Sequence, residues 1–468
     1  MSVVLPITLC LLSGYVAVSL GWPAGRRGED LLLRCSLSAG FGIGIFSLYF
    51  AVFRLLDLSS FPILKLLALL AFIAVVAARK KGSRTEDPAR KDIILPLRYH
   101  RVLFCSVLFA VFAALHSVLR RAIAHPHGDG WDAFAIWNLH ARFLFLGGAS
   151  WRDGFTALIP WSHPDYPLLL PAAIAHFWSY LGNANPIVPA VISVTFAFIT
   201  LALLYSSLYR LRGVNAAMLA TLTLASTPFF VSQGASQCAD VPLSFYFLAT
   251  ITLFCLHSQH VQSASGIIAL AGLSAGCAAW TKNEGILFLF AAIVGQLLAL
   301  FTRRHPAPSR GQSEAFLSSI SFVLGSIPFF VLTVWFKHLA PPVDLFSTPA
   351  SMPAKLMDSS RYWVILNWYA KEFFRFGEWW IVPGTVLLAV LYTMTSKPTP
   401  PLTLAYRASA WCLGLTLAGY FAIYVITPNE LHWHLRTSLN RLFLQLWPSV
   451  IFLFFSSVSF RSFNNVSK

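Results

Sequence analysis

The chain has 468 residues, of which 57% are hydrophobic and only 11% are charged. Soluble globular domains carry about 25% charged residues, so this composition excludes them and indicates an all-α polytopic membrane protein. The net charge of +16 does not indicate a nucleic-acid partner. Its Lys and Arg fall in short segments between apolar stretches, where cytoplasmic retention and anionic lipid headgroups account for them.

Apolar stretches of about 20 residues, the length that crosses a bilayer, recur from end to end. The first lacks the positive flank of a secretory signal, so a retained helix is expected. The seven cysteines have no paired spacing and indicate neither a disulfide framework nor a metal knuckle. About 13 spans are predicted, at 1–21, 31–56, 60–78, 102–119, 187–208, 214–232, 241–257, 264–280, 285–302, 315–338, 379–396, 405–427 and 438–460.

Orientation follows from the basic segments, which are retained in the cytoplasm. The strongest are 79–101 and 303–310, with lesser pairs at 26–27 and 210–212. All four face the cytoplasm only if the apolar piece Tyr166–Leu181 does not cross, so we expect it to be re-entrant or interfacial. The alternative is a true span that violates the rule.

The whole chain, 1–468, is expected to form one membrane-embedded unit. Its parts are N-terminal helices with a basic loop (1–119), an outer catalytic loop (120–186), central helices (187–338), a second outer loop (339–378) and C-terminal helices (379–468). Most unusual polar residues then lie on the non-cytoplasmic side, which predicts a reaction at the outer leaflet.

The longest interruption, 125–171, concentrates scarce carboxylates and amphipathic rings, as is typical of chemistry at a bilayer surface. It holds Asp129, Asp132, Asp153, Asp165, Trp131, Trp137, Trp151 and Trp161. In the helix predicted over 131–145, Asn138 and Arg142 share a face. Asp132, at its start, is either a helix-terminal charge or a base or metal ligand.

Two further segments carry acidic residues. In SHPDYP (162–167), prolines make a rigid turn, so His163 and Asp165 either bind a metal or a phosphate-bound cation or form an ordinary turn. In SQCADVPL (236–243), Asp240 precedes an apolar span, where an acidic residue is commonly a cap. It would also sit at the depth of the central loop.

Two segments carry cations near hydrocarbon, where charges are expensive unless paired. In WTKNEG (280–285), Lys282 either pairs with Glu284 or meets a phosphate. The segment 427–441 holds candidate anion-binding residues or an interfacial belt; these are Glu430, His432, His434, Arg436 and Arg441. The two histidines at i, i+2 do not share a helix face, so an HExxH zinc site is not indicated.

At these residues the chain resembles the GT-C superfamily of integral-membrane glycosyltransferases. It is most similar to protein O-mannosyltransferases and lipid A aminoarabinose transferases. The pattern is an acidic residue, an aromatic and an Ala-Arg pair in the first large outer loop, then a proline-rich turn and a second acidic residue. Asp132, Trp137, Ala141-Arg142, residues 163–167 and Asp240 match it.

The resemblance implies a sugar donor linked to a polyprenyl phosphate and a lipid, glycan or protein acceptor at the outer face of a bacterial plasma membrane, within the cell envelope. Asp132, Asp165 and Asp240 become the candidate catalytic residues. Substrate binding is assigned to Arg142, His163, Lys282, Glu284, His434 and Arg436. A divalent cation, Mg²⁺ or Mn²⁺, would be held by Asp132 and Asp165.

Rival interpretations remain. A transporter or lipid flippase would show related halves and a central polar path, and no internal repeat is visible. An O-antigen-type ligase or polymerase would depend on arginines and a histidine in a late outer loop, which Glu430 to Arg441 allows. A structural scaffold would not need the clustered carboxylates.

Overall fold

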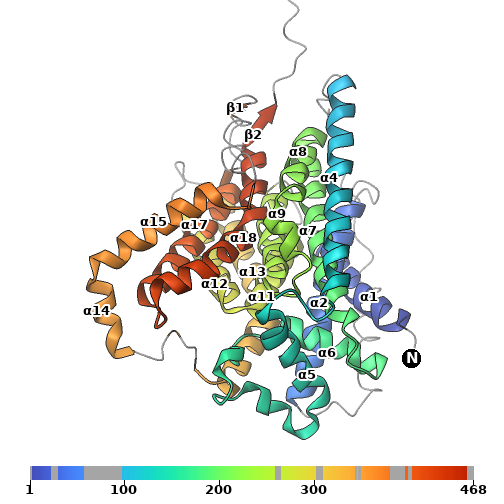
Figure 1. Ribbon diagram of the computed structural model, residues 1–468. Helices are drawn as coiled ribbons and strands as arrows, with labels where there is room; N and C mark the ends of the chain where they lie inside the picture. Colours follow the sequence, from blue (N-terminus) through green and yellow to red (C-terminus); the bar gives the residue numbers. More distant parts are fainter. Residues whose placement is uncertain are drawn as a thin grey trace, which may run out of the picture.

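The computed structural model describes residues 3–22, 30–56, 97–258, 265–301, 309–342, 345, 349–379, 396–398 and 403–460. This part of the chain is almost entirely helical (Figure 1). Two short strands, β1 (Ser396–Pro398) and β2 (Val458–Phe460), pair in antiparallel fashion. The expected all-α membrane class is therefore confirmed for the described residues.

Among the described residues, nine helices are long and apolar enough to cross a membrane. They are α1 (Val4–Gly21), α2 (Leu31–Leu55), α4 (Leu97–Ala124), α7 (Ile187–Arg212), α10 (Asp240–His257), α12 (Asn283–Phe301), α13 (Ser309–Leu339), α17 (Thr403–Ile426) and α18 (Leu431–Ser457). The protein is thus a multi-pass integral membrane protein.

Shorter helices complete the bundle. They are α5 (Leu139–Leu146), α6 (Leu169–Leu181), α8 (Val214–Ala225), α9 (Pro228–Gln233), α11 (Ser265–Thr281), α14 (Met352–Met357) and α15 (Ser359–Arg375). A π-helical segment, Ala133–Asn138, precedes α5, and 3₁₀ turns lie at Gly148–Phe155, Pro160–Ser162 and Pro349–Ser351.

Every expected span in the described part coincides with a helix except 214–232. This stretch divides into α8 and α9, because Pro228 cannot continue the hydrogen-bonding of the preceding helix. The expected spans 60–78 and 379–396 lie outside the described residues. The count of 13 therefore stays a prediction.

Two expected loops contain helices. The second outer loop, 339–378, holds α14 and α15, and most of the segment 427–441 forms the first turns of α18, which begins at Leu431. A stretch rich in Trp, Tyr and charge forms a helix here because one side packs on the bundle, and the assignment of both segments to the outer face stays a prediction. In α15 that side is centred on the buried Ile365.

The segment after the central loop does not form a long helix. With 13 residues, α6 is about 20 Å long, well short of the ~30 Å hydrocarbon core. Figure 1 shows α5 and α6 together at the lower end of the bundle. This length fits the prediction that the segment does not cross, and its depth in a bilayer stays a prediction.

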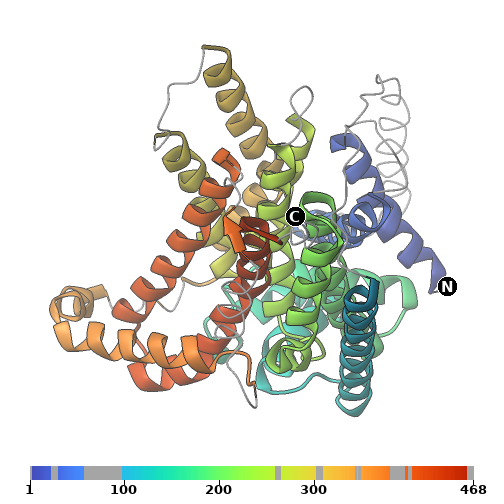
Figure 2. The ribbon, with the colours of Figure 1, turned by 90° about the horizontal axis from the view of Figure 1, so that it is seen from above.

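Helix α10 lies at the centre of the bundle. All its residues from Asp240 to Leu256 are buried, and it packs against α7, α11 and α18. Seen from above, the N-terminal helices and α15 flank this centre on opposite sides (Figure 2). The start of α10 is therefore enclosed by neighbouring helices.

Helices α11 and α13 cross at very close range. A Cβ at Gly272 would lie 1.9 Å from the backbone oxygen of Phe322, and one at Gly325 would lie 2.0 Å from that of Ala269. Small residues allow such backbone approach between membrane helices. This contact fixes the end of α11 relative to the end of α13, where two cations of the site described below are found.

The end of α7 and the start of α2 lie close together. Arg210, in the last turn of α7, forms an ion pair of 3.6 Å with Asp30, just before α2. The segments around residues 30 and 210 therefore lie together, as predicted if both face one compartment.

Candidate active site

The first residue of α10, Asp240, is a fully buried carboxylate with three side-chain partners. Lys282 donates from Nζ at 3.1 Å, Arg441 from Nε at 2.7 Å and Gln445 from Nε2 at 2.7 Å. Burying a carboxylate is tolerated only with such compensation. Asp240 is therefore not a simple helix cap: its charge is directed at two cations.

Arg441, on α18, connects this buried carboxylate to the central loop. Its guanidinium also forms an ion pair with Asp132, whose side chain is 33% exposed against 0% for Asp240. The two aspartates are thus held by one guanidinium, and Asp132 is the member that solvent or a substrate can reach.

Asp132 leads directly into the π-helical segment Ala133–Asn138. Such segments are rare and frequently occur at functional sites. At its end, Asn138 donates to the side chain of Gln237 at 2.8 Å and to the backbone oxygen of His127 at 3.2 Å. The loop before Asp132 is therefore tied to the segment that precedes Asp240.

The turn between α11 and α12 supplies the second cation. Lys282 lies 2.8 Å from Glu284 as well as contacting Asp240, and its ammonium is 5.9 Å from the ring centre of Tyr166. Burial alone would lower the pKa of Lys282, but the two carboxylates hold it above its usual range, so the side chain is a cation. The Lys282–Glu284 pair, one of the two alternatives, is thus present in the structure, and a role toward phosphate stays a prediction.

The next residue of the same turn joins a second charged group. Asn283 donates to Asp165 at 2.8 Å and accepts from Lys337 at 2.6 Å, while Lys337 and Asp165 form an ion pair of 2.9 Å. Two adjacent residues, Lys282 and Asn283, therefore connect carboxylates from the start of α10 and from the proline-rich turn. We call the whole set the charged cluster; it comprises Asp132, Asp165, Asp240, Lys282, Asn283, Glu284, Lys337, Arg441 and Gln445.

Aromatic rings cover one side of this cluster. Tyr166 stacks on Trp137, with ring centres 5.7 Å apart, and on His163 at 4.6 Å. Burial raises the pKa of the Tyr166 phenol above its ordinary range, so the ring is neutral. His163 adopts a left-handed backbone conformation with φ 50°, which turns the chain toward the cluster and places this predicted residue at its edge.

Two predicted substrate-binding residues, Arg142 and Arg436, have no contact with the charged cluster among the described residues, whereas His434 is close enough to Glu284 and Lys282 to interact with them electrostatically. Arg142 lies over the ring of Phe134 at 5.8 Å. His434 contacts the Thr427 hydroxyl at 2.8 Å, and Arg436 is exposed on α18. Five residues separate Arg436 from Arg441, so they occupy different helix faces.

Of the two arginines that the sequence offers on α18, Arg441 is the one that contacts the cluster. Lys337 and Gln445 are not among the residues predicted from the sequence. A usable signal existed for Lys337, because it is a cation close to the end of a long apolar helix, where a charge needs a partner. Gln445 lies four residues after Arg441 and so shares its face.

The expected metal ligands, Asp132 and Asp165, do not come together. Each is occupied by a cationic side chain, Arg441 or Lys337 respectively. Among the described residues no three His, Cys, Asp or Glu side chains gather in a way that could hold a metal ion. The carboxylates as arranged therefore do not form a binding site for a divalent cation.

The described helices form an apolar bundle with a charged cluster at the ends of several of them, an arrangement that a membrane-embedded enzyme can use. Residues 162–335 match the model of the dolichyl-phosphate-mannose-protein mannosyltransferase family, a family of the GT-C superfamily. The predicted resemblance is thereby confirmed, and the match points to a membrane glycosyltransferase of the GT-C type. No curated protein and no solved structure matches the chain.

The matched segment includes only some residues of the charged cluster. It contains Asp165, Asp240, Lys282 and Glu284. Asp132 and Arg441 lie outside it, so the likeness predicted over 131–142 is not supported by the family match and rests on the pattern of residues alone.

Proposed function

We propose that this protein transfers a sugar from a polyprenyl-phosphate donor to a lipid, glycan or protein acceptor at the non-cytoplasmic face of the membrane. The observation that carries the proposal is the junction of Asp132, Arg441, Asp240 and Lys282 at the end of an apolar helix bundle. A partly exposed carboxylate on Arg441, which shares Asp240 with the buried Lys282, suits a reaction with a hydroxyl acceptor and a phosphate leaving group.

Asp132 is the proposed base. Of the three aspartates expected to act, it has the most exposed side chain, with 33% of its surface accessible against 4% for Asp165 and 0% for Asp240. It would take the proton of the acceptor hydroxyl as the oxygen attacks the anomeric carbon. The bond between that carbon and the phosphate oxygen breaks, and the lipid phosphate leaves with the bonding electrons.

Arg441 and Lys282 are the proposed phosphate-stabilising residues. Negative charge grows on the departing phosphate, and fixed cations in a site of low dielectric stabilise it. Arg441 holds Asp132 in the absence of donor, so a phosphate that binds Arg441 competes with this carboxylate. Donor binding would thereby release Asp132 to act on the acceptor.

Asp240 and Asp165 are proposed to position the cations rather than to react. Asp240 is enclosed by three donors, and Asp165 by Lys337 and Asn283. Each fixes a side chain that would otherwise move or change protonation state. Glu284 has the same relation to Lys282.

The assay incubates membranes containing the protein with labelled polyprenyl-phosphate sugars and follows label in the acceptor fraction. We expect Asp132→Asn to lower transfer at least 100-fold, in the range of general-base catalysis. Asp153→Asn is the matched control, because Asp153 is exposed in the same loop and has no contact with the cluster. Equal transfer by the two variants would refute the role of Asp132.

Two further experiments test the expected metal ion and the expected orientation. A chelator arm tests the expected Mg²⁺ or Mn²⁺, and unchanged transfer with chelator removes the metal from the scheme. Reporter fusions after Leu181 and after Arg212 test the orientation, which predicts a non-cytoplasmic reporter at the first position and a cytoplasmic one at the second.

A further inference from the structure

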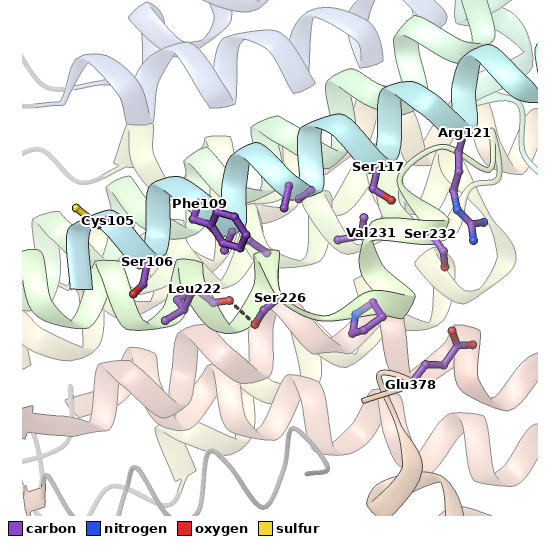
Figure 3. Close-up of a pocket in the computed structure, with 15 residues that line it drawn as sticks. Cys105, Ser106, Phe109, Ser117, Arg121, Leu222, Ser226, Val231, Ser232 and Glu378 are labelled. Carbon is purple, nitrogen blue, oxygen red and sulfur yellow. Dashed lines mark hydrogen bonds between the residues drawn. The ribbon is translucent and has the colours of Figure 1, made fainter. Parts of the chain in front are cut away.

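A groove runs along one side of the bundle. It lies between α4 on one side and α8 with α9 on the other, and has a volume of about 870 Å³. Figure 3 shows Cys105 and Phe109 at one end, and Arg121 with Ser232 at the other. A concave space of this size can hold a sizeable ligand.

The groove exists because α8 ends early and α4 carries small residues toward it. Helix α8 ends at Ala225 and α9 begins at Pro228, which displaces the chain. The α4 wall includes Ala113 and Ser117, which leave room that larger side chains would fill. The feature therefore follows from the local sequence.

The groove has a charged end and an uncharged, mainly apolar remainder, in which Ser106 and Ser226 also line the wall. From Cys105 to Arg121 it follows about 24 Å of α4 at 1.5 Å per residue, most of the thickness of a hydrocarbon core. Phe109 and Leu222 line the apolar part, whereas Arg121 and Glu378 lie at the other end. This gradient matches an amphipathic molecule with one long chain.

The polar end is adjacent to the candidate active site. Arg121 forms an ion pair of 2.8 Å with Asp129, three residues before Asp132. The same loop is fixed to the site by Gln237, whose side-chain amide donates to the backbone oxygen of Pro126 at 3.1 Å. A headgroup at Arg121 would therefore have a short path to Asp132.

We infer that this groove holds the isoprenoid chain of one polyprenyl-phosphate lipid as it enters, with the phosphate at the Arg121 end before it reaches Arg441 and Lys282. Arg121 supplies the complementary positive charge on the α4 wall, and Asp129 competes with the phosphate for it. Glu378 repels the phosphate from the opposite wall. The inference rests on the proposed function for the identity of the lipid, and its test does not require transfer.

Two native cysteines make the test direct. Cys105 lines the groove, whereas Cys35 is exposed on α2, and the remaining five cysteines include none that is exposed. The protein is placed in phosphatidylcholine nanodiscs, and the rate of N-ethylmaleimide labelling at both positions is measured as polyprenyl phosphate is added. We expect at least 5-fold slower labelling of Cys105 and no change at Cys35.

Variants of the groove give effects of opposite sign. Arg121→Gln should weaken protection about 10-fold, as expected for loss of a charged hydrogen bond. Asp129→Asn should strengthen it, because Arg121 loses its competitor. Ala113→Trp, which fills the groove, should abolish protection, whereas Phe112→Trp, on the exposed surface of α4 outside the lining, should not.

The outcomes separate the two proposals. Equal protection of Cys105 by phosphatidylglycerol, or the same result for Ala113→Trp and Phe112→Trp, would overturn the groove assignment. Transfer activity without any protection of Cys105 would also overturn it and leave the proposed function intact. Protection of Cys105 by polyprenyl phosphate with no transfer from any polyprenyl-phosphate sugar would support the groove and count against the function.

Discussion

Replacing Asp240 by Asn removes the carboxylate that, in the described part of the chain, contacts both Lys282 and Arg441. The substitution keeps the shape of the side chain and its contact with Gln445 but leaves two cations facing a neutral amide. Because Lys282 has 7% of its side chain exposed and Arg441 has 21%, water can compensate only partly. We therefore expect a loss of stability.

The magnitude follows from the remaining partners. Breaking a buried ion pair by removing one member costs about 3–5 kcal/mol. Lys282 keeps Glu284 and Arg441 keeps Asp132, so the effect should fall at the lower end, about 3 kcal/mol. Asp132→Asn removes a partly exposed partner and should cost about 1 kcal/mol or less.

The measurement is equilibrium unfolding in mixed micelles, with the SDS fraction varied and helix content followed by circular dichroism. Asp240→Asn is compared with Asp132→Asn and with the double variant Asp240→Asn/Lys282→Met. The double variant should recover part of the loss, because it removes one of the uncompensated charges. If Asp240→Asn is no less stable than Asp132→Asn, the network does not hold the fold as argued.

Further predictions concern other parts of the structure. Lys337→Met should cost about 3 kcal/mol in the same unfolding assay, because it leaves the buried Asp165 without its cation; an unchanged midpoint would contradict this. Burial lowers the pKa of His140 to about 3, and the imidazole of His163 adds a smaller lowering. The unfolded imidazole binds a proton below about pH 6.5 while the folded one does not, so the free energy of unfolding should fall by about 1.4 kcal/mol per unit as pH drops from about 6.5 toward 5. His140→Gln should show a shallower pH dependence of its unfolding midpoint, and identical slopes would exclude this cause. Gly272→Ala should destabilise by about 1–3 kcal/mol through overpacking, whereas Gly414→Ala, where a Cβ meets nothing within 4 Å, should be neutral; equal midpoints would argue against close helix contact.

The fold class could be predicted because hydrocarbon thickness imposes a length on each span. Apolar composition alone predicts spans at 187–208 and 405–427, and these coincide with α7 and α17. The helix break at Pro228 could also have been predicted, since proline disfavours a continuous helix. The helical content of 339–378 was not, because α15 depends on packing against α17 and α18.

The candidate site was predicted in part. Scarce carboxylates pointed to Asp132, Asp165 and Asp240, and the structure links all three to cations at one end of the bundle. The sequence offered Arg436 and Arg441 on equal terms, because the choice depends on which face of α18 meets α10. Contacts of this kind depend on helix rotation, which periodicity does not specify when apolar residues occupy every face of a buried helix.

The residues of the charged cluster that contact one another lie far apart in the sequence, which has a consequence for biogenesis. Asp240 meets Lys282 after 42 further residues have been synthesised, but Arg441 only after 201, and Asp132 waits 309 residues for the same guanidinium. A nascent chain halted before α18 would therefore carry an incompletely neutralised acidic pair within the insertion machinery.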